Sequence, residues 1–150
     1  MSRWNSVDEV LDFAIAREQE AVDFYLKLAA QVASPALREM LQDFAEEERG
    51  HKEKLLGVKA GDKLRGADAA VTDLKMADYL VDVAPRPQMS LAEILILAMK
   101  REKAAFSLYT RLASMISDPD VRKLFLALAQ EEAKHKLRFE IEYDEYLTEG

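Results

Sequence analysis

Two glutamate–histidine pairs with the same spacing are the residues of this sequence best suited to chemistry. They are Glu48-x-x-His51 and Glu132-x-x-His135, and they contain both histidines of the chain. This spacing places the two side chains of a pair on one face of a helix, where a carboxylate and an imidazole can bind one metal ion. Subtracting 48 from 132 gives an offset of 84, and the same offset relates Glu18 to Glu102.

These six residues interrupt apolar stripes that indicate helices. In four segments, apolar residues recur at alternating intervals of four and three, which keeps them on one side of an α-helix. The middle of each stripe holds ionisable residues with apolar neighbours on both sides. The residues are Glu18, Glu48, His51, Glu102, Glu132 and His135. No lysine or arginine lies on a stripe to neutralise the four carboxylates.

A pair of metal ions would resolve this charge problem. An unpaired buried carboxylate costs several kcal/mol, and carboxylates placed together also repel one another. Two divalent cations balance four carboxylates. The carboxylate oxygens and imidazole nitrogens then supply about five donors to each ion and leave about one open position. The six residues are therefore predicted to bind a dinuclear metal centre, and their chemistry suits iron, manganese or zinc.

The segments that contain these residues form an internal repeat in the sequence. The offset of 84 also places Tyr25 on Tyr109 and Ser34-Pro35 on Asp118-Pro119. The repeat covers about 6–58 and 90–142 within one predicted domain, 1–150. Helices are predicted at about 6–31, 35–58, 90–116 and 119–147.

The predicted helix starts and connections favour a particular bundle. Ser6 and Ser90 each precede a glutamate by three residues, which is capping-box spacing, and the two proline dipeptides combine an N-cap with proline at the first helical position. Short links join the first helix to the second and the third to the fourth, so the helices of each pair are expected to be antiparallel neighbours. Residues 59–89 form a long crossover between the two pairs, and a short helix or extended segment lying on the bundle is expected within it. The predicted fold class is all-α, a four-helix bundle of ferritin-like connectivity.

The composition excludes several other classes of protein. The chain has 150 residues, a formal net charge of −7 and no cysteine. The charge argues against a nucleic-acid partner, and the absence of cysteine excludes disulfides, thiolate metal sites and a cysteine nucleophile. No purely apolar run exceeds the six residues seen at 94–99, which is too short to span a membrane, and no signal peptide is evident, so a cytoplasmic protein is expected.

Other polar residues near the six have simpler interpretations. Glu20, Glu47 and Glu131 lie off the stripes and are expected on solvated faces. Tyr25 and Tyr109 lie one stripe position from the metal layer. Each could pack in the core, or also act as a candidate catalytic residue whose hydroxyl hydrogen-bonds a ligand carboxylate.

Together these motifs resemble the rubrerythrin branch of the ferritin-like superfamily. The resemblance rests on Glu18…Tyr25, Glu102…Tyr109 and the two Glu-Glu-x-x-His sequences, and it spans nearly the whole chain. It implies two iron ions bound by Glu18, Glu48, His51, Glu102, Glu132 and His135. It also implies that Glu48 and Glu132 bridge the metals, and that the protein reduces hydrogen peroxide or dioxygen.

The chain departs from typical rubrerythrins in two places. Without cysteines it cannot form their rubredoxin-like iron site, so electrons would come from a separate donor protein. It also lacks their additional glutamate in the third helix, since residues 103–106 contain no carboxylate. The chain is thus similar to the shorter rubrerythrin-like group. A ferroxidase or iron-handling protein and a non-enzymatic metal-binding bundle are the alternatives, and a homodimer is expected.

Overall fold

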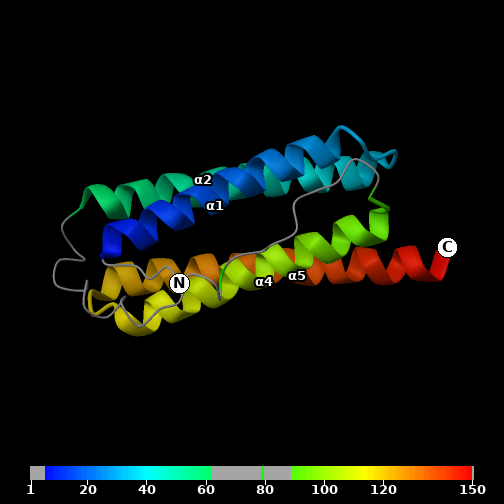
Figure 1. Ribbon diagram of the computed structural model, residues 1–150. Helices are drawn as coiled ribbons and strands as arrows, with labels where there is room; N and C mark the ends of the chain where they lie inside the picture. Colours follow the sequence, from blue (N-terminus) through cyan, green and yellow to red (C-terminus); the bar gives the residue numbers. More distant parts are fainter. Residues whose placement is uncertain (1–5, 62–78, 80–88, 150) are drawn as a thin grey trace. The chain divides into compact units, whose positions relative to one another are not determined.

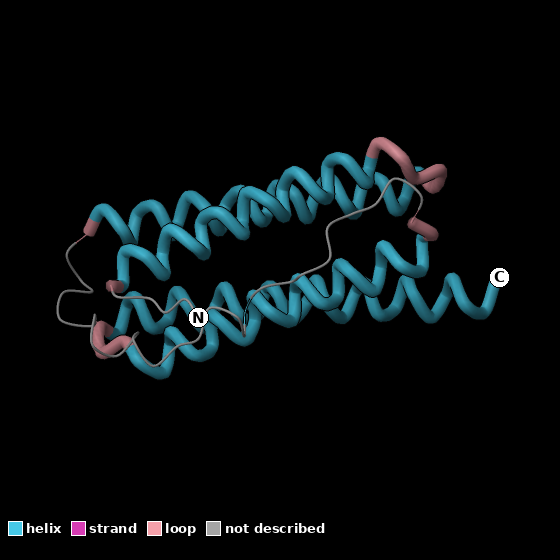
Figure 2. The backbone as a smooth tube through the Cα atoms, viewed as in Figure 1, coloured by secondary structure: helices cyan, strands magenta, loops and turns pink. Residues whose placement is uncertain are grey.

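Four long α-helices dominate the computed structural model, which describes residues 6–61, 79 and 89–149. They are α1 (Val7–Ala29), α2 (Pro35–Ala60), α4 (Leu91–Met115) and α5 (Pro119–Glu149) (Figure 1). Figure 2 shows helices and short loops, and no strand, in these described ranges. Every helix begins and ends within two residues of its predicted position, so the predicted helices are confirmed.

The helices begin where their capping residues predict. Ser6, Ser34 and Ser90 each accept a hydrogen bond from the backbone N–H three residues further on, at 3.2 Å. At Ser90 the bond is reciprocated, because the backbone N–H of Ser90 donates to the Glu93 carboxylate at 3.0 Å. Asp118 accepts from two backbone N–H groups in the first turn of α5, each at 3.0 Å. These bonds satisfy donors that the start of a helix leaves without an intrahelical partner.

The helices form two hairpins, and each hairpin is a compact unit of its own. One contains α1 and α2, and the other contains α4 and α5. In each hairpin an arginine near the start of the second helix donates to carbonyl groups at the end of the first. Arg38 donates to Ala29 at 3.2 Å and to Val32 at 2.9 Å, and Arg122 donates twice to Ile116, at 3.0 and 2.7 Å. Charged donors thereby satisfy carbonyls left open where the chain turns.

The buried residues follow the predicted stripes. On α1, the stripe from Val7 to Leu28 is buried throughout. On α5, the stripe from Val121 to Phe139 is buried throughout as well. Four stripe residues elsewhere are only half-buried, and they are Leu37, Phe44, Leu91 and Ala105. The predicted periodicity therefore identifies the inward faces correctly.

Two predictions concern other parts of the chain. Most of the 59–89 crossover, including the segment expected to lie on the bundle, falls outside the described residues. Among the residues that are described, no helix is both long enough and apolar enough to cross a membrane.

Candidate metal centre

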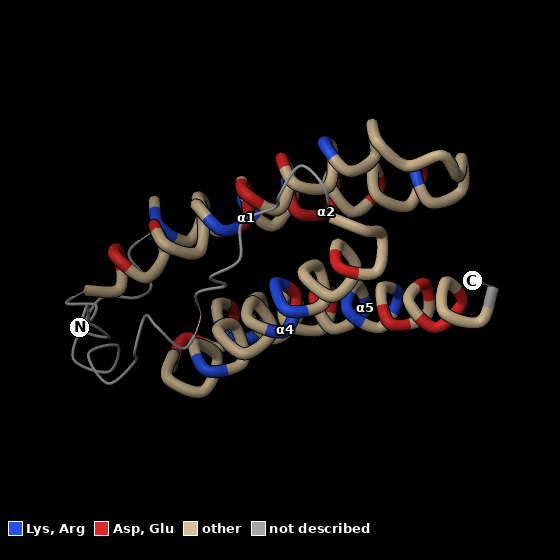
Figure 3. The backbone as a smooth tube through the Cα atoms, turned by 45° about the vertical axis from the view of Figure 1, so that its right-hand side comes forward, with Lys and Arg blue, Asp and Glu red and all other residues tan. Residues whose placement is uncertain are grey.

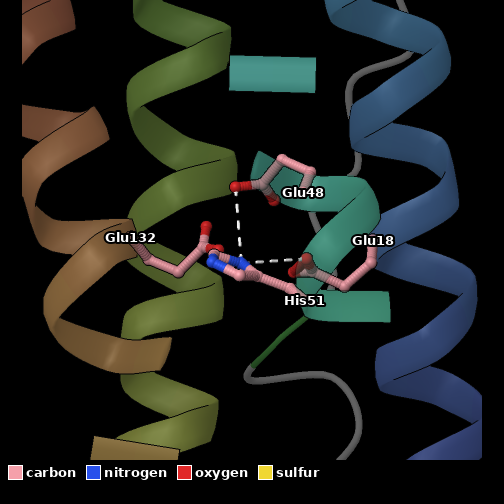
Figure 4. A group of neighbouring side chains, drawn as sticks. All are labelled: Glu18, Glu48, His51 and Glu132. Carbon is pink, nitrogen blue, oxygen red and sulfur yellow. Dashed lines mark ion pairs between the residues drawn. The ribbon is translucent and has the colours of Figure 1, made fainter. Parts of the chain in front are cut away.

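The first hairpin brings three of the predicted ligands together. Glu18 comes from α1, and Glu48 and His51 come from α2 (Figure 4). The Nδ1 atom of His51 lies 3.2 Å from Oε2 of Glu18 and 3.6 Å from Oε1 of Glu48. The three side chains offer one ligand atom each, and these atoms lie within 4.8 Å of one another. We call these three residues cluster 1.

The second hairpin repeats this arrangement. Glu102 comes from α4, and Glu132 and His135 come from α5. The Nδ1 atom of His135 lies 3.6 Å from Oε1 of Glu102. The ligand atoms of the three side chains again lie within 4.8 Å of one another. We call these three residues cluster 2, and the sequence offset of 84 maps cluster 1 onto it.

Helical spacing and small neighbours explain how each cluster forms. Glu48 and His51 share one face of α2 because they are three residues apart. On α1, Ala14 and Ala21 flank Glu18 along the buried stripe. Alanine leaves space beside the carboxylate that a larger apolar side chain would fill. Each pair of helices therefore presents two carboxylates and one imidazole at the middle of its buried face.

Burial makes the clusters electrostatically unusual. The six residues are at most 3 % exposed, and they are all of the buried polar or charged residues in the described part of the chain. No lysine or arginine is buried with them among those residues. Each cluster carries two carboxylates, so one divalent cation for each cluster would balance its formal charge. The donor set, two carboxylates and one imidazole, fits iron, manganese or zinc.

The basic residues that flank cluster 1 in the sequence bind elsewhere. Lys52, next to His51, donates to the side-chain oxygen of Gln19 at 2.8 Å. Arg17, next to Glu18, donates to Glu20 at 3.0 Å. The Arg17 bond is exposed and the Lys52 bond is partly buried, and both residues lie off the buried stripes.

The glutamates expected to stay outside the clusters do so. Glu20 and Glu47 are exposed, and Glu131 is half-buried. None of the three belongs to a group of described side chains able to hold a metal ion. The distinction that helical periodicity draws between Glu47 and Glu48, or between Glu131 and Glu132, is therefore seen in the structure.

Tyr25 and Tyr109 both lie in the core. The Tyr25 ring meets the Phe44 ring edge-on, with 6.2 Å between the ring centroids. The Tyr109 ring stacks on Phe125 at the same centroid distance. These contacts confirm the packing role, while a hydrogen bond from either hydroxyl to a ligand carboxylate stays a prediction.

Comparison with solved structures identifies the class of fold to which this chain belongs. A protein of Thermotoga maritima, provisionally described as a ferritin-like diiron-carboxylate protein, aligns with a TM-score of 0.79 and 21 % identity, over 97 % of this chain and 99 % of that one. A hypothetical protein of Pyrococcus furiosus aligns with a TM-score of 0.73 and 25 % identity, over 95 % and 91 % of the two chains. No curated protein matches. The all-α, ferritin-like fold class is confirmed.

The family follows from the sequence itself. The pattern of the rubrerythrin family matches residues 9–143, which include both clusters. The chain belongs to the rubrerythrin family.

Proposed function

We propose that clusters 1 and 2 together hold two iron ions and that the protein uses them to reduce hydrogen peroxide or dioxygen. The observation that carries this proposal is that the six buried polar residues are two copies of the same Glu, Glu, His set. A purely structural core would not repeat a pair of buried carboxylates with no buried lysine or arginine in the described residues beside it, because each carboxylate costs free energy to bury. Membership of the rubrerythrin family supports iron as the metal.

Iron suits the chemistry because it can change oxidation state while its protein ligands stay in place. When bound, two Fe(II) ions supply the two electrons that reduce one hydrogen peroxide molecule to two waters, with uptake of two protons. The carboxylates and imidazoles hold the ions in a buried setting. About one coordination position on each ion remains for the oxidant if every ligand atom is used.

Re-reduction of the iron requires a separate electron donor under this proposal. The chain contains no cysteine, so it cannot build an iron–sulfur or thiolate iron site of its own. We expect a redox protein to dock transiently and return two electrons after each turnover.

Anaerobic loading with Fe(II), followed by one equivalent of hydrogen peroxide, tests this function. We expect two irons bound per chain, oxidation of both by a single peroxide molecule, and recovery of the ferrous state on reduction. Zinc-loaded protein is the first control, because zinc has no redox chemistry. Glu132→Gln should lose iron and activity, whereas Glu131→Gln, its half-buried neighbour, should keep both.

Three results would contradict the proposal. Two tightly bound irons that fail to react with either peroxide or dioxygen would indicate a structural metal site. Uptake of many more than two irons per chain would indicate an iron-storage protein. Equal effects of the two glutamine substitutions would show that burial does not select the ligands.

A further inference from the structure

The two hairpins differ in the hydrogen bonds that they make beside their clusters. In the first hairpin, the Nζ atom of Lys52 on α2 donates to the side-chain oxygen of Gln19 on α1 at 2.8 Å. Gln19 directly follows the ligand Glu18 on α1. Lys52 directly follows the ligand His51 on α2. The bond therefore joins the two helices at the level of the ligands that they contribute. We call the pair Gln19 and Lys52 the clamp.

The side-chain amide of Gln19 is itself held in orientation. Its nitrogen donates to the Asp23 carboxylate at 3.0 Å, one turn further along α1. Because the nitrogen and the oxygen of an amide lie on different sides of the group, this bond leaves the oxygen turned toward Lys52. The bond between Gln19 and Lys52 is partly buried, so water competes for it less than for an exposed pair. The clamp is therefore an ordered contact between α1 and α2.

The second hairpin carries two lysines at the clamp positions. The offset of 84 places Lys103 on Gln19 and Lys136 on Lys52. Two ammonium groups repel each other and neither can accept a hydrogen bond, so this pair cannot form the clamp. Figure 3 shows basic residues in the middle of α4, where Lys103 directly follows the ligand Glu102. Lys136 donates to Glu140 on its own helix at 3.0 Å.

A second difference between the repeats explains why the two lysines bond differently. The offset places Leu56 of α2 on Glu140 of α5. Leu56 offers Lys52 no acceptor one turn along its own helix, and the acceptor on α1 is Gln19. The lysine of the first hairpin therefore joins two helices, whereas the lysine of the second hairpin bonds within one helix.

The separation of the ligand atoms differs in the same direction. The Nδ1 atom of His51 lies 3.2 Å from Oε2 of Glu18. The Nδ1 atom of His135 lies 3.6 Å from Oε1 of Glu102. Two ligand atoms that lie about 2.1 Å from one ion, at an angle of about 90–110°, are about 3.0–3.4 Å apart. Cluster 1 already has that separation, whereas cluster 2 must close before both atoms can bind one ion.

We infer that Gln19 and Lys52 are positioning residues for the metal centre, and that cluster 1 binds its metal ion before cluster 2 and more tightly. The clamp fixes α1 against α2 before the ion arrives, so cluster 1 loses less conformational freedom on binding. Residues that orient metal ligands typically change affinity by about 10–100-fold, and we expect about a tenfold difference between the clusters. The inference rests on the proposed two-metal site and does not require its redox chemistry.

Zinc titration of the untagged, metal-free full chain, followed by NMR of the imidazole groups, tests the order of binding. The chain has two histidines, one in each cluster, so each cluster has a signal of its own. We expect the signals of His51, assigned with a His51→Gln variant, to change with the first equivalent of zinc. Those of His135 should change with the second equivalent. Calorimetric titration of the same samples gives the two dissociation constants.

Removing the clamp should weaken cluster 1 against the electrostatic trend. Lys52→Met deletes a positive charge near a cation site, and by charge alone this change would strengthen metal binding. We expect it to weaken zinc binding at cluster 1 about tenfold and to leave cluster 2 unchanged. Gln19→Met alters no charge and should have the same effect. The double variant should lose no more affinity than either single variant, because both substitutions remove one contact.

The second hairpin supplies the matched controls. Lys136→Met removes the same charge at the equivalent position of α5, where the lysine bonds within its own helix, and should not weaken cluster 2. Lys103→Gln combined with Glu140→Leu transfers the clamp to the second hairpin without a change in net charge. This double variant should bind zinc about tenfold more tightly at cluster 2, so that both histidines respond together.

The possible results separate this inference from the proposed function. If His135 responds first, or if both clusters of the natural protein bind zinc equally well, the inference is wrong and the two-metal site stands. An unchanged order of binding in Gln19→Met and Lys52→Met would show that the clamp does not position the ligands, even if both variants melt at a lower temperature. Fewer than two zinc ions per chain would overturn the two-metal site and this inference with it. Two ions that bind in the expected order, in a protein whose iron form does not react with peroxide or dioxygen, would support the inference and contradict only the redox function.

Discussion

Replacing Glu48 by glutamine should have opposite effects on the metal-free and the metal-loaded protein. In the metal-free protein, Glu48 shares a buried cluster with Glu18, and no buried lysine or arginine accompanies them in the described residues. Glutamine has nearly the same shape but carries no charge. The substitution therefore removes a repulsion from the metal-free state and a ligand charge from the metal-bound state.

The distance within cluster 1 sets the size of the effect. The ligand oxygens of Glu18 and Glu48 lie within 4.8 Å of each other. Two unit charges at that separation repel by about 3.5 kcal/mol in a medium of effective dielectric constant 20. Allowing for local relaxation, we expect Glu48→Gln to stabilise the metal-free protein by about 2 kcal/mol. For a chain of this length, that change raises the melting temperature by about 4–8 °C.

The metal-loaded protein should respond with the opposite sign. Loss of one anionic ligand should weaken binding at least about a hundredfold, which removes about 2.7 kcal/mol of metal-linked stability. Thermal unfolding with chelator and with excess metal, at pH 8, measures both effects on one sample. Glu47→Gln is the control, because the neighbouring Glu47 is exposed. A less stable metal-free Glu48→Gln protein, or an unchanged response to metal, would refute the electrostatic reasoning.

Other predictions concern the scaffold. Gly50→Ala should raise the free energy of unfolding by about 0.5–1 kcal/mol, because an added Cβ would meet nothing within 4 Å; a lower melting temperature would contradict this. Arg122→Met should lower the free energy of unfolding by about 1.5–3 kcal/mol in denaturant titrations, because the carbonyl of Ile116 loses two hydrogen bonds. The hydrogen bond to Asp12 raises the pKa of Lys59 above its ordinary 10.5, so this contact stabilises the fold below pH 10.5 and is lost as pH rises through the raised pKa. Asp12→Asn should lower the pKa of Lys59 in an NMR titration and leave the variant as stable as the natural protein at higher pH.

The sequence predicts the helices and the clusters well because both depend on local periodicity. Glu48 and Glu47 differ by one position, yet helical spacing alone separates the buried residue from the exposed one. The repeat supplies a second, independent copy of the same pattern. Serine and aspartate caps locate the helix starts because their side chains bond to backbone groups within the next three residues.

Features that depend on contacts beyond the helix were harder to predict. Arg38 and Arg122 look like ordinary surface residues, and their role depends on carbonyls presented by the preceding turn. The only feature of the sequence that indicates a shared role for the two arginines is the offset of 84 residues between them. Phe44 lies on the predicted stripe but is only half-buried. Helical periodicity predicts the side of the helix on which a residue lies, and it does not predict how completely neighbouring elements bury that residue.

Anomalous diffraction from crystals of iron-loaded protein would test the central claim most directly. We predict two iron peaks for each chain, one coordinated by Glu18, Glu48 and His51 and the other by Glu102, Glu132 and His135. A single peak, peaks at exposed carboxylates, or buried clusters that remain empty at saturating iron would contradict the account.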